Sequence, residues 1–186
     1  IKLNKHQIKM LQDYRDKSYV MNVLLTRSYE RFAFIKQITN IPLILSSSAM
    51  AIVNSSSFNG EDIKLPNIII NSLTAFTIAM IGNFQINQKE VLFQTLSGKF
   101  LKLTHQIEDD LTNNLEDITK SDVKKYIDDY DNLIGAITYV IPRDIQNKVK
   151  NMYCGKKCLP AFLNCEGDFT NSRNSGELVE LGYSNA

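Results

Sequence analysis

Charged side chains are missing from two stretches of the chain, and this is the most informative feature of its hydrophobic and polar pattern. There are 24 consecutive uncharged residues between Lys36 and Glu61, and another 24 between Lys64 and Lys89. Within them, residues 41–58 (IPLILSSSAMAIVNSSSF) and 67–84 (NIIINSLTAFTIAMIGNF) are apolar segments of 18 residues each. A helix of that length spans about 27 Å, at the short end of what a bilayer core of about 30 Å requires.

Two interpretations of these segments differ in what surrounds them. They form either a transmembrane hairpin or a buried helical hairpin in the core of a soluble domain. We favour the membrane interpretation, because small and hydroxyl-bearing residues let helices approach closely and hydrogen-bond to each other in lipid. The residues expected at such contacts are Pro42, Ser46, Ser47, Ala49, Ala51 and Asn54 in the first segment and Asn71, Ser72, Ala75, Ala79 and Gly82 in the second.

Proline marks the expected start of each segment, since a proline in the first turn of a helix removes no needed hydrogen bond. Pro42 follows Thr39 and Asn40, either of which is a suitable N-cap, and Pro66 stands in the same place before the second segment. The connector, residues 59–66, is so short that the two segments are expected to be antiparallel neighbours.

The distribution of basic residues predicts the orientation of such a hairpin. Residues 1–40 contain eight Lys and Arg against three acidic residues, whereas the connector contains one Lys. Because basic flanks remain on the cytoplasmic side of a membrane, both termini are expected on the cytoplasmic or particle-interior side. Residues 1–40 are also predicted to form a basic amphipathic helix, which either lies near an anionic headgroup surface or is one helix of a bundle.

The pattern after the hairpin (residues 41–87) predicts more helices. Leu92, Leu96, Phe100, Leu103, Ile107 and Leu111 are spaced 4, 4, 3, 4 and 4 residues apart, which is typical of a helix-pairing seam. We expect this helix to continue unbroken from the second apolar segment to about residue 113. Helices beginning at Ser121-Asp122 and Pro142 complete a bundle region over residues 88–153. Residues 154–186 form an irregular tail that is ordered only where a partner holds it.

Composition narrows the possible functions. The net charge is +1, which removes the electrostatic basis for binding nucleic acid. The chain has no Gly-rich phosphate loop, no Gly-x-Ser-x-Gly and no His-Glu-x-x-His. We therefore expect no catalytic residues, no cofactor, no metal and no small-molecule substrate.

Three cysteines are the remaining candidates for chemistry. Cys154, Cys158 and Cys165 would need a fourth ligand to hold zinc, and Glu166 or Asp168 fits the known spacings poorly. A disulfide between Cys154 and Cys158 is geometrically possible and would leave one cysteine over. Three reduced thiols in a loop are the favoured interpretation.

Taken together, these elements resemble the SLATT family of two-transmembrane proteins, and most of all the versions carried by large DNA viruses. The resemblance covers about residues 1–153. It is carried by Ser28-Tyr29-Glu30-Arg31-Phe32, residues 41–48 (IPLILSSS), the second apolar segment, the seam, and residues 130–134 (YDNLI) before Ile141-Pro142.

The resemblance implies an all-α, self-associating, non-enzymatic membrane protein whose partners are the lipid bilayer and either further copies or other structural proteins. Viral relatives suggest a structural component of a virion or viral membrane, whereas bacterial members suggest a pore-forming effector tied to nucleotide signalling. A soluble helical scaffold, such as a minor capsid protein held by its tail, is the third hypothesis.

Overall fold

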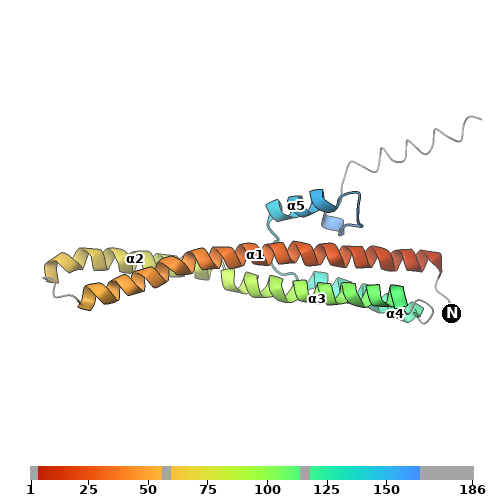
Figure 1. Cartoon of the computed structure of the whole chain (residues 1–186), viewed down its shortest axis with the longest axis horizontal. Coiled ribbons are helices and arrows are strands. Elements are labelled where there is room, and N and C mark those ends of the chain that lie inside the picture. The colour runs from red at the N-terminus through yellow and green to blue at the C-terminus, as the bar shows by residue number, and fades with distance from the viewer. Residues whose placement is uncertain (1–3, 56–59, 114–117, 164–186) are drawn as a thin grey trace, which may run out of the picture. The chain divides into compact units, whose positions relative to one another are not determined.

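The computed structural model describes residues 4–55, 60–113 and 118–163, and the regular secondary structure within them is entirely helical. Five α-helices and one 3-10 helix follow one another along this part of the chain (Figure 1). Their bounds are α1 Lys5–Ser55, α2 Gly60–Asn83, α3 Ile86–Asn113, α4 Lys120–Gly135, α5 Arg143–Tyr153 and η1 Ala161–Leu163. The predicted all-α fold class is therefore confirmed for the described residues. The predicted irregular tail lies outside them from residue 164 onward.

The chain divides into two compact units. The first, which we call the bundle unit, consists of Ile1–Leu25 and Leu96–Ala186, and the second, the apolar unit, is Thr26–Thr95. Helices α1 and α3 contribute to both units, whereas α2 belongs to the apolar unit and α4 and α5 to the bundle unit. The boundaries expected after residues 40 and 87 do not coincide with this division.

A hydrophobic core holds the bundle unit together. Tyr130 of α4 is 7% exposed and belongs to this core. Its ring packs edge-on against Tyr14 of α1, with ring centres 5.3 Å apart, and against Phe100 of α3 at 5.8 Å. Aromatic pairs in this geometry add to the stabilisation from burial alone. One residue thus joins three helices.

The two short helices begin close to where the sequence places them. The N-cap of α4 is Thr119, two residues before the expected cap, and it forms a reciprocal capping box with Asp122. Each of these two side chains satisfies a backbone N–H of the other residue, as capping boxes do. Helix α5 is capped by Pro142, at the proline predicted to open it.

The expected helix starts at Pro42 and Pro66 are wrong, because both prolines lie inside longer helices. Thr39, expected to cap a new helix, instead donates its hydroxyl proton to the carbonyls of Ile35 and Lys36, each at 2.9 Å. A hydroxyl used in this way belongs to a helix interior. The helix continues through Pro42 to Ser55. Because proline has no backbone N–H, one hydrogen bond between backbone groups is missing at this point of the helix.

The expected unbroken helix from the second apolar segment to residue 113 is also wrong. Helix α2 ends at Asn83 and α3 begins at Ile86. Between them Gln85 has φ of +51°, which is left-handed backbone that cannot continue a right-handed helix. The chain therefore forms two helices here instead of one.

Candidate membrane-embedded surface

Large hydrophobic side chains are buried in the bundle unit and exposed in the apolar unit. Of the eighteen hydrophobic residues buried in the described chain, sixteen belong to the bundle unit. Of the nineteen large hydrophobic residues exposed there, fifteen lie between residues 34 and 91. They are Phe34, Ile38, Ile41, Ile44, Leu45, Ile52, Leu65, Ile68, Ile69, Leu73, Phe76, Ile78, Met80, Phe84 and Val91. An apolar surface of this extent is typical of contact with lipid or with another protein, not with water.

One stretch among the described residues, Lys64–Asn113, is long and apolar enough to cross a membrane. It includes most of α2 and all of α3. Length and composition alone are weak evidence, since the core helix of a soluble protein passes the same test. No part of the most apolar 18-residue window is buried, however, whereas a core helix is mostly buried.

Helices α1 and α2 contact each other within the apolar unit, and each has a narrow stripe of half-buried residues there. The hydroxyl oxygens of Ser46 and Thr74 lie 3.1 Å apart. Figure 1 shows α2 beside the C-terminal part of α1. The half-buried residues of α2 are spaced alternately by three and four, as at a helix-pairing seam. They are Asn67, Ile70, Thr74, Thr77 and Ile81, and the half-buried residues of α1 in this region are Leu43, Ser46, Ala49 and Met50.

Several polar side chains of these two helices form hydrogen bonds with the backbone of their own helix. Ser46 and Ser47 donate to the carbonyl of Leu43 at 2.9 and 3.0 Å. Ser48 and Thr77 donate in the same way, each to the carbonyl four residues before it. Hydroxyls bonded to their own helix do not need water, which makes the exposed surface compatible with hydrocarbon.

The residues predicted for helix association occupy two different environments. Ser46 and Ala49 are half-buried in the α1–α2 contact, and Asn54 lies in α1 but its side chain is outside the described part. The remaining predicted residues are exposed in the single chain. They are Pro42, Ser47, Ala51, Asn71, Ser72, Ala75, Ala79 and Gly82.

Four of these exposed residues form a second stripe on α2. Ser72, Ala75, Ala79 and Gly82 are spaced 3, 4 and 3 residues apart. At about 100° per residue, this small-residue stripe is centred roughly 140° around the helix from the stripe that contacts α1. A methyl group added at Gly82 would meet no atom within 4 Å. The small-residue stripe therefore has no partner within the described chain.

A polar and aromatic cluster lies where α1 contacts the beginning of α3 in the apolar unit. The Lys36 ammonium is 2.7 Å from the Glu90 carboxylate, and the Glu90 side chain is 14% exposed. Beside this ion pair, the rings of Phe32 and Phe93 lie 5.7 Å apart, and the Lys89 ammonium lies 5.7 Å from the Phe32 ring centre. The sequence indicated only that Lys36 and Lys89 border the uncharged stretches. Nothing in it identified Glu90 as a partner.

The predicted helix-pairing seam on α3 faces the interior of the fold. Leu96, Phe100, Leu103 and Ile107 are at most 3% exposed, and Leu92 and Leu111 are half-buried. Phe93, which the predicted spacing left out, is completely buried. Phe100 contacts Tyr130 of the same chain, so this part of the seam packs within the bundle unit.

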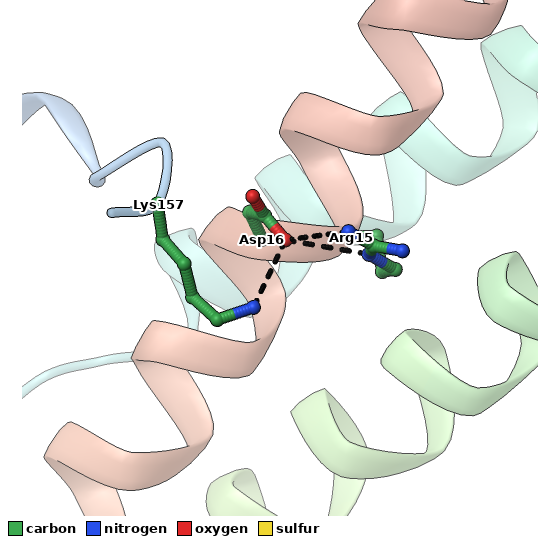
Figure 2. Close-up of polar contacts among 3 residues, drawn as sticks. All are labelled: Arg15, Asp16 and Lys157. Carbon is green, nitrogen blue, oxygen red and sulfur yellow. Dashed lines mark hydrogen bonds and ion pairs between the residues drawn. The ribbon is translucent and has the colours of Figure 1, made fainter. Parts of the chain in front are cut away.

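The bundle unit carries a small charged cluster that connects the segment after α5 to α1 (Figure 2). Asp16 forms ion pairs with Arg15 at 2.9 Å and with Lys157 at 3.2 Å. The Lys157 ammonium also lies 4.7 Å from the centre of the Tyr19 ring. The three charged side chains are 18 to 31% exposed. Such partly exposed pairs orient the segment after α5 and contribute little free energy.

The cysteines differ from the favoured expectation of three reduced thiols. Cys154 is disulfide-bonded and Cys158 is free, so a bond between these two is also excluded. Burial, and then the nearby Asp13 carboxylate, raises the pKa of the Cys158 thiol. Cys165, Glu166 and Asp168 lie outside the described residues, within which no group of three candidate metal ligands occurs.

Comparison of the chain with family models, with curated proteins and with solved structures finds no match. The resemblance to the SLATT family therefore remains a prediction from the sequence.

Proposed function

We propose that this chain is a non-enzymatic, self-associating membrane protein, anchored by an antiparallel hairpin of the C-terminal part of α1 with α2. The single observation that carries the proposal is the contrast in exposure between the two units. One chain buries its hydrophobic residues in the bundle unit and leaves fifteen large ones exposed between residues 34 and 91. Burial of such surface in hydrocarbon is worth about 25 cal/mol per Å², so water is an unfavourable environment for it.

The hydrogen bonding of the two helices supports the same conclusion. A segment in lipid must satisfy its polar groups internally. Ser47 and Ser48 are exposed, yet both are bonded to carbonyls of their own helix. The exposed amide of Asn71 donates to the Asn67 side chain at 2.6 Å. This pattern fits helices surrounded by lipid and by other helices.

Self-association is proposed through the small-residue stripe of α2. Small residues in this spacing let helix backbones approach closely in lipid. Since the α1–α2 contact uses the opposite side of α2, this stripe is available to a second hairpin. The basic N-terminal flank favours the orientation with both termini on the cytoplasmic or particle-interior side. A virion or infected-cell membrane is the setting that the resemblance implies.

Alkaline carbonate extraction of the expressed full chain tests the anchor, with a variant lacking residues 41–84 as the control. The full chain is expected in the membrane pellet and the deletion variant in the supernatant. Recovery of the full chain in the supernatant would refute the anchor and favour the soluble scaffold.

A pore is the second candidate, and the exposed Asn71 and Ser72 on α2 favour it, because a pore needs polar side chains on an outer helix face. Leakage of a small dye from vesicles that contain the chain separates the two. An anchor leaves the dye inside, whereas a pore releases it in proportion to the protein added.

A further inference from the structure

A shallow apolar hollow lies on the bundle unit where the chain passes from α4 to α5, and we call it the α4–α5 hollow. Its volume is about 250 Å³. Five of its six lining residues are aliphatic or aromatic, and the sixth, Gln146, donates its amide N–H to the carbonyl of Ile141 at 2.8 Å. The hollow therefore favours an apolar occupant. The lining residues are Ile134, Ile137, Tyr139, Ile141, Gln146 and Phe162.

The α4–α5 hollow coincides with exposed hydrophobic surface that a membrane anchor does not explain. Phe162 is 49% exposed, and Val140, between two lining residues in the chain, is 85% exposed. Both belong to the bundle unit, whereas the proposed anchor uses the apolar unit. Pockets for small molecules usually have volumes of about 300–1,000 Å³. The α4–α5 hollow is smaller, which suits a few side chains of a peptide segment.

The chain that continues from the hollow contains an apolar segment of the right kind. Phe162 precedes by two residues the point, residue 164, from which the chain lies outside the described part. Residues 164–177 are mostly polar, and residues 178–183 (LVELGY) then have four apolar side chains among six. A flexible peptide of 14 residues has an average end-to-end distance of about 20 Å, and an extended one reaches about 45 Å. Residues 178–183 are therefore close enough in the chain to return to the hollow.

The charges of the two parts are complementary. Residues 139–163 contain five basic side chains and one acidic side chain. Lys157 is used by the ion pair with Asp16, and the other five groups have a net charge of +3. Residues 164–186 contain four acidic side chains and one basic side chain, a net charge of −3. Opposite charges of this size favour the approach of the two parts and fix their orientation.

We propose that residues 178–183 dock in the α4–α5 hollow of the same chain. Leu178 and Leu181 fill the hollow, and Glu177 and Glu180 face the exposed basic residues of α5. A short linker holds its segment at an effective concentration of about 1 mM, which favours docking within the chain over docking of a partner at lower concentration. Both parts belong to the bundle unit, so the docking does not depend on the membrane anchor.

The test uses the full chain, mixed with phosphatidylcholine vesicles, with the photoreactive residue p-benzoylphenylalanine in place of Tyr183. Irradiation is expected to crosslink this residue to residues 134–146 or to Phe162, as identified by mass spectrometry. The product is expected to migrate as a single chain on a denaturing gel. Leu178→Ser with Leu181→Ser is expected to lower the yield about tenfold or more, because burial of the two leucines supplies most of the affinity.

Asn171→Ser with Asn174→Ser is the matched control, since it changes two residues at the same spacing in the polar stretch before the segment. It is expected to keep the yield. Phe162→Ser changes the hollow instead of the segment, at a side chain that is half exposed, and is expected to lower the yield as well.

Four outcomes would overturn the docking: no crosslink, a crosslink outside the hollow, equal yields in the leucine and asparagine variants, or an unchanged yield in Phe162→Ser. A crosslink that joins two chains would overturn docking within one chain and assign the hollow to a second copy. Carbonate extraction of the same samples tests the anchor separately. A chain that stays in the pellet without the crosslink refutes only the docking, whereas a crosslinked chain that washes off refutes only the anchor.

Discussion

A charge placed at the middle of α2 distinguishes a lipid-facing surface from a surface in water. Leu73 lies near the centre of the second apolar segment and is 60% exposed. If water surrounds it, Leu73→Lys changes an exposed residue that makes no critical contact, and such changes alter stability by no more than about 0.5 kcal/mol. If lipid surrounds it, the lysine has to enter hydrocarbon.

The cost in lipid follows from the insertion energies of the two side chains. At the centre of a transmembrane helix, leucine contributes about −0.5 kcal/mol and lysine about +3 kcal/mol to insertion. The substitution therefore costs about 3 to 4 kcal/mol, which corresponds to more than a hundredfold change in the ratio of inserted to uninserted chains. The α2 segment contains several Asn, Ser and Thr residues and has little insertion energy to spare, so we expect most of the Leu73→Lys chains to be uninserted.

Val140→Lys is the matched control. Val140 is 85% exposed and lies in the bundle unit, between α4 and α5, where the proposed function predicts water. The same apolar-to-lysine change there is expected to leave membrane recovery unchanged. Both variants and the wild-type chain are expressed in parallel and separated by carbonate extraction and flotation.

Equal recovery of Leu73→Lys and Val140→Lys in the membrane pellet would show that the exposed face of α2 does not meet hydrocarbon. A second contrary result is a Leu73→Lys chain that is a more soluble, fully folded protein while the wild-type chain washes off with carbonate. That second result would assign the exposed surface to a protein partner in water.

Three further predictions concern the bundle unit. Tyr130→Ala is expected to lower the free energy of unfolding by about 3 to 4 kcal/mol in denaturant titrations, because it empties the junction of three helices, whereas the exposed Leu101→Ala stays within about 0.5 kcal/mol. Ser18→Ala is expected to leave the free energy of unfolding unchanged or to raise it by up to about 1 kcal/mol. The reason is that the fully buried Ser18 hydroxyl has no hydrogen-bond partner among the described residues. A clear decrease in the free energy of unfolding would instead show that this hydroxyl has a hydrogen-bond partner. Cys158 is expected to react with iodoacetamide more slowly than free cysteine at pH 7.5, because burial raises the pKa of its thiol and the thiolate is the reactive form. The rate is expected to rise only at a pH higher than the one at which free cysteine becomes reactive. A rate equal to that of free cysteine would contradict this.

Local signals were sufficient to predict much of the bundle unit. The capping residues before α4 and the proline before α5 predict helix starts within about two residues of those observed. The spacing from Leu96 to Ile107 predicts the face of α3 that is buried. In each case the signal and the structure it specifies lie within a few residues, so no information about the rest of the fold is needed.

The helix boundaries of the apolar unit depend on more than local signals. Pro42 and Pro66 are each compatible with a helix start, but the structure places each of them inside a longer helix. At Gln85 the sequence pattern predicts a continuous helix, but the structure has a break. Its left-handed backbone follows Gly82 and Asn83, which are weak helix formers, but the sequence pattern around it stays apolar and helical. A period-based prediction therefore joins two helices that the backbone separates.

The partner of each face of α2 is the part that the sequence could not predict. Two stripes with the spacing of helix-pairing seams coexist on this helix, one running from Asn67 to Ile81 and the other from Ser72 to Gly82. Small side chains favour close contact, and the residues of the second stripe are among those predicted for helix association, without a stated partner. The structure places Thr74, in the first stripe, against Ser46. The small-residue stripe is thereby left exposed, and close packing between copies is the use that its composition fits best.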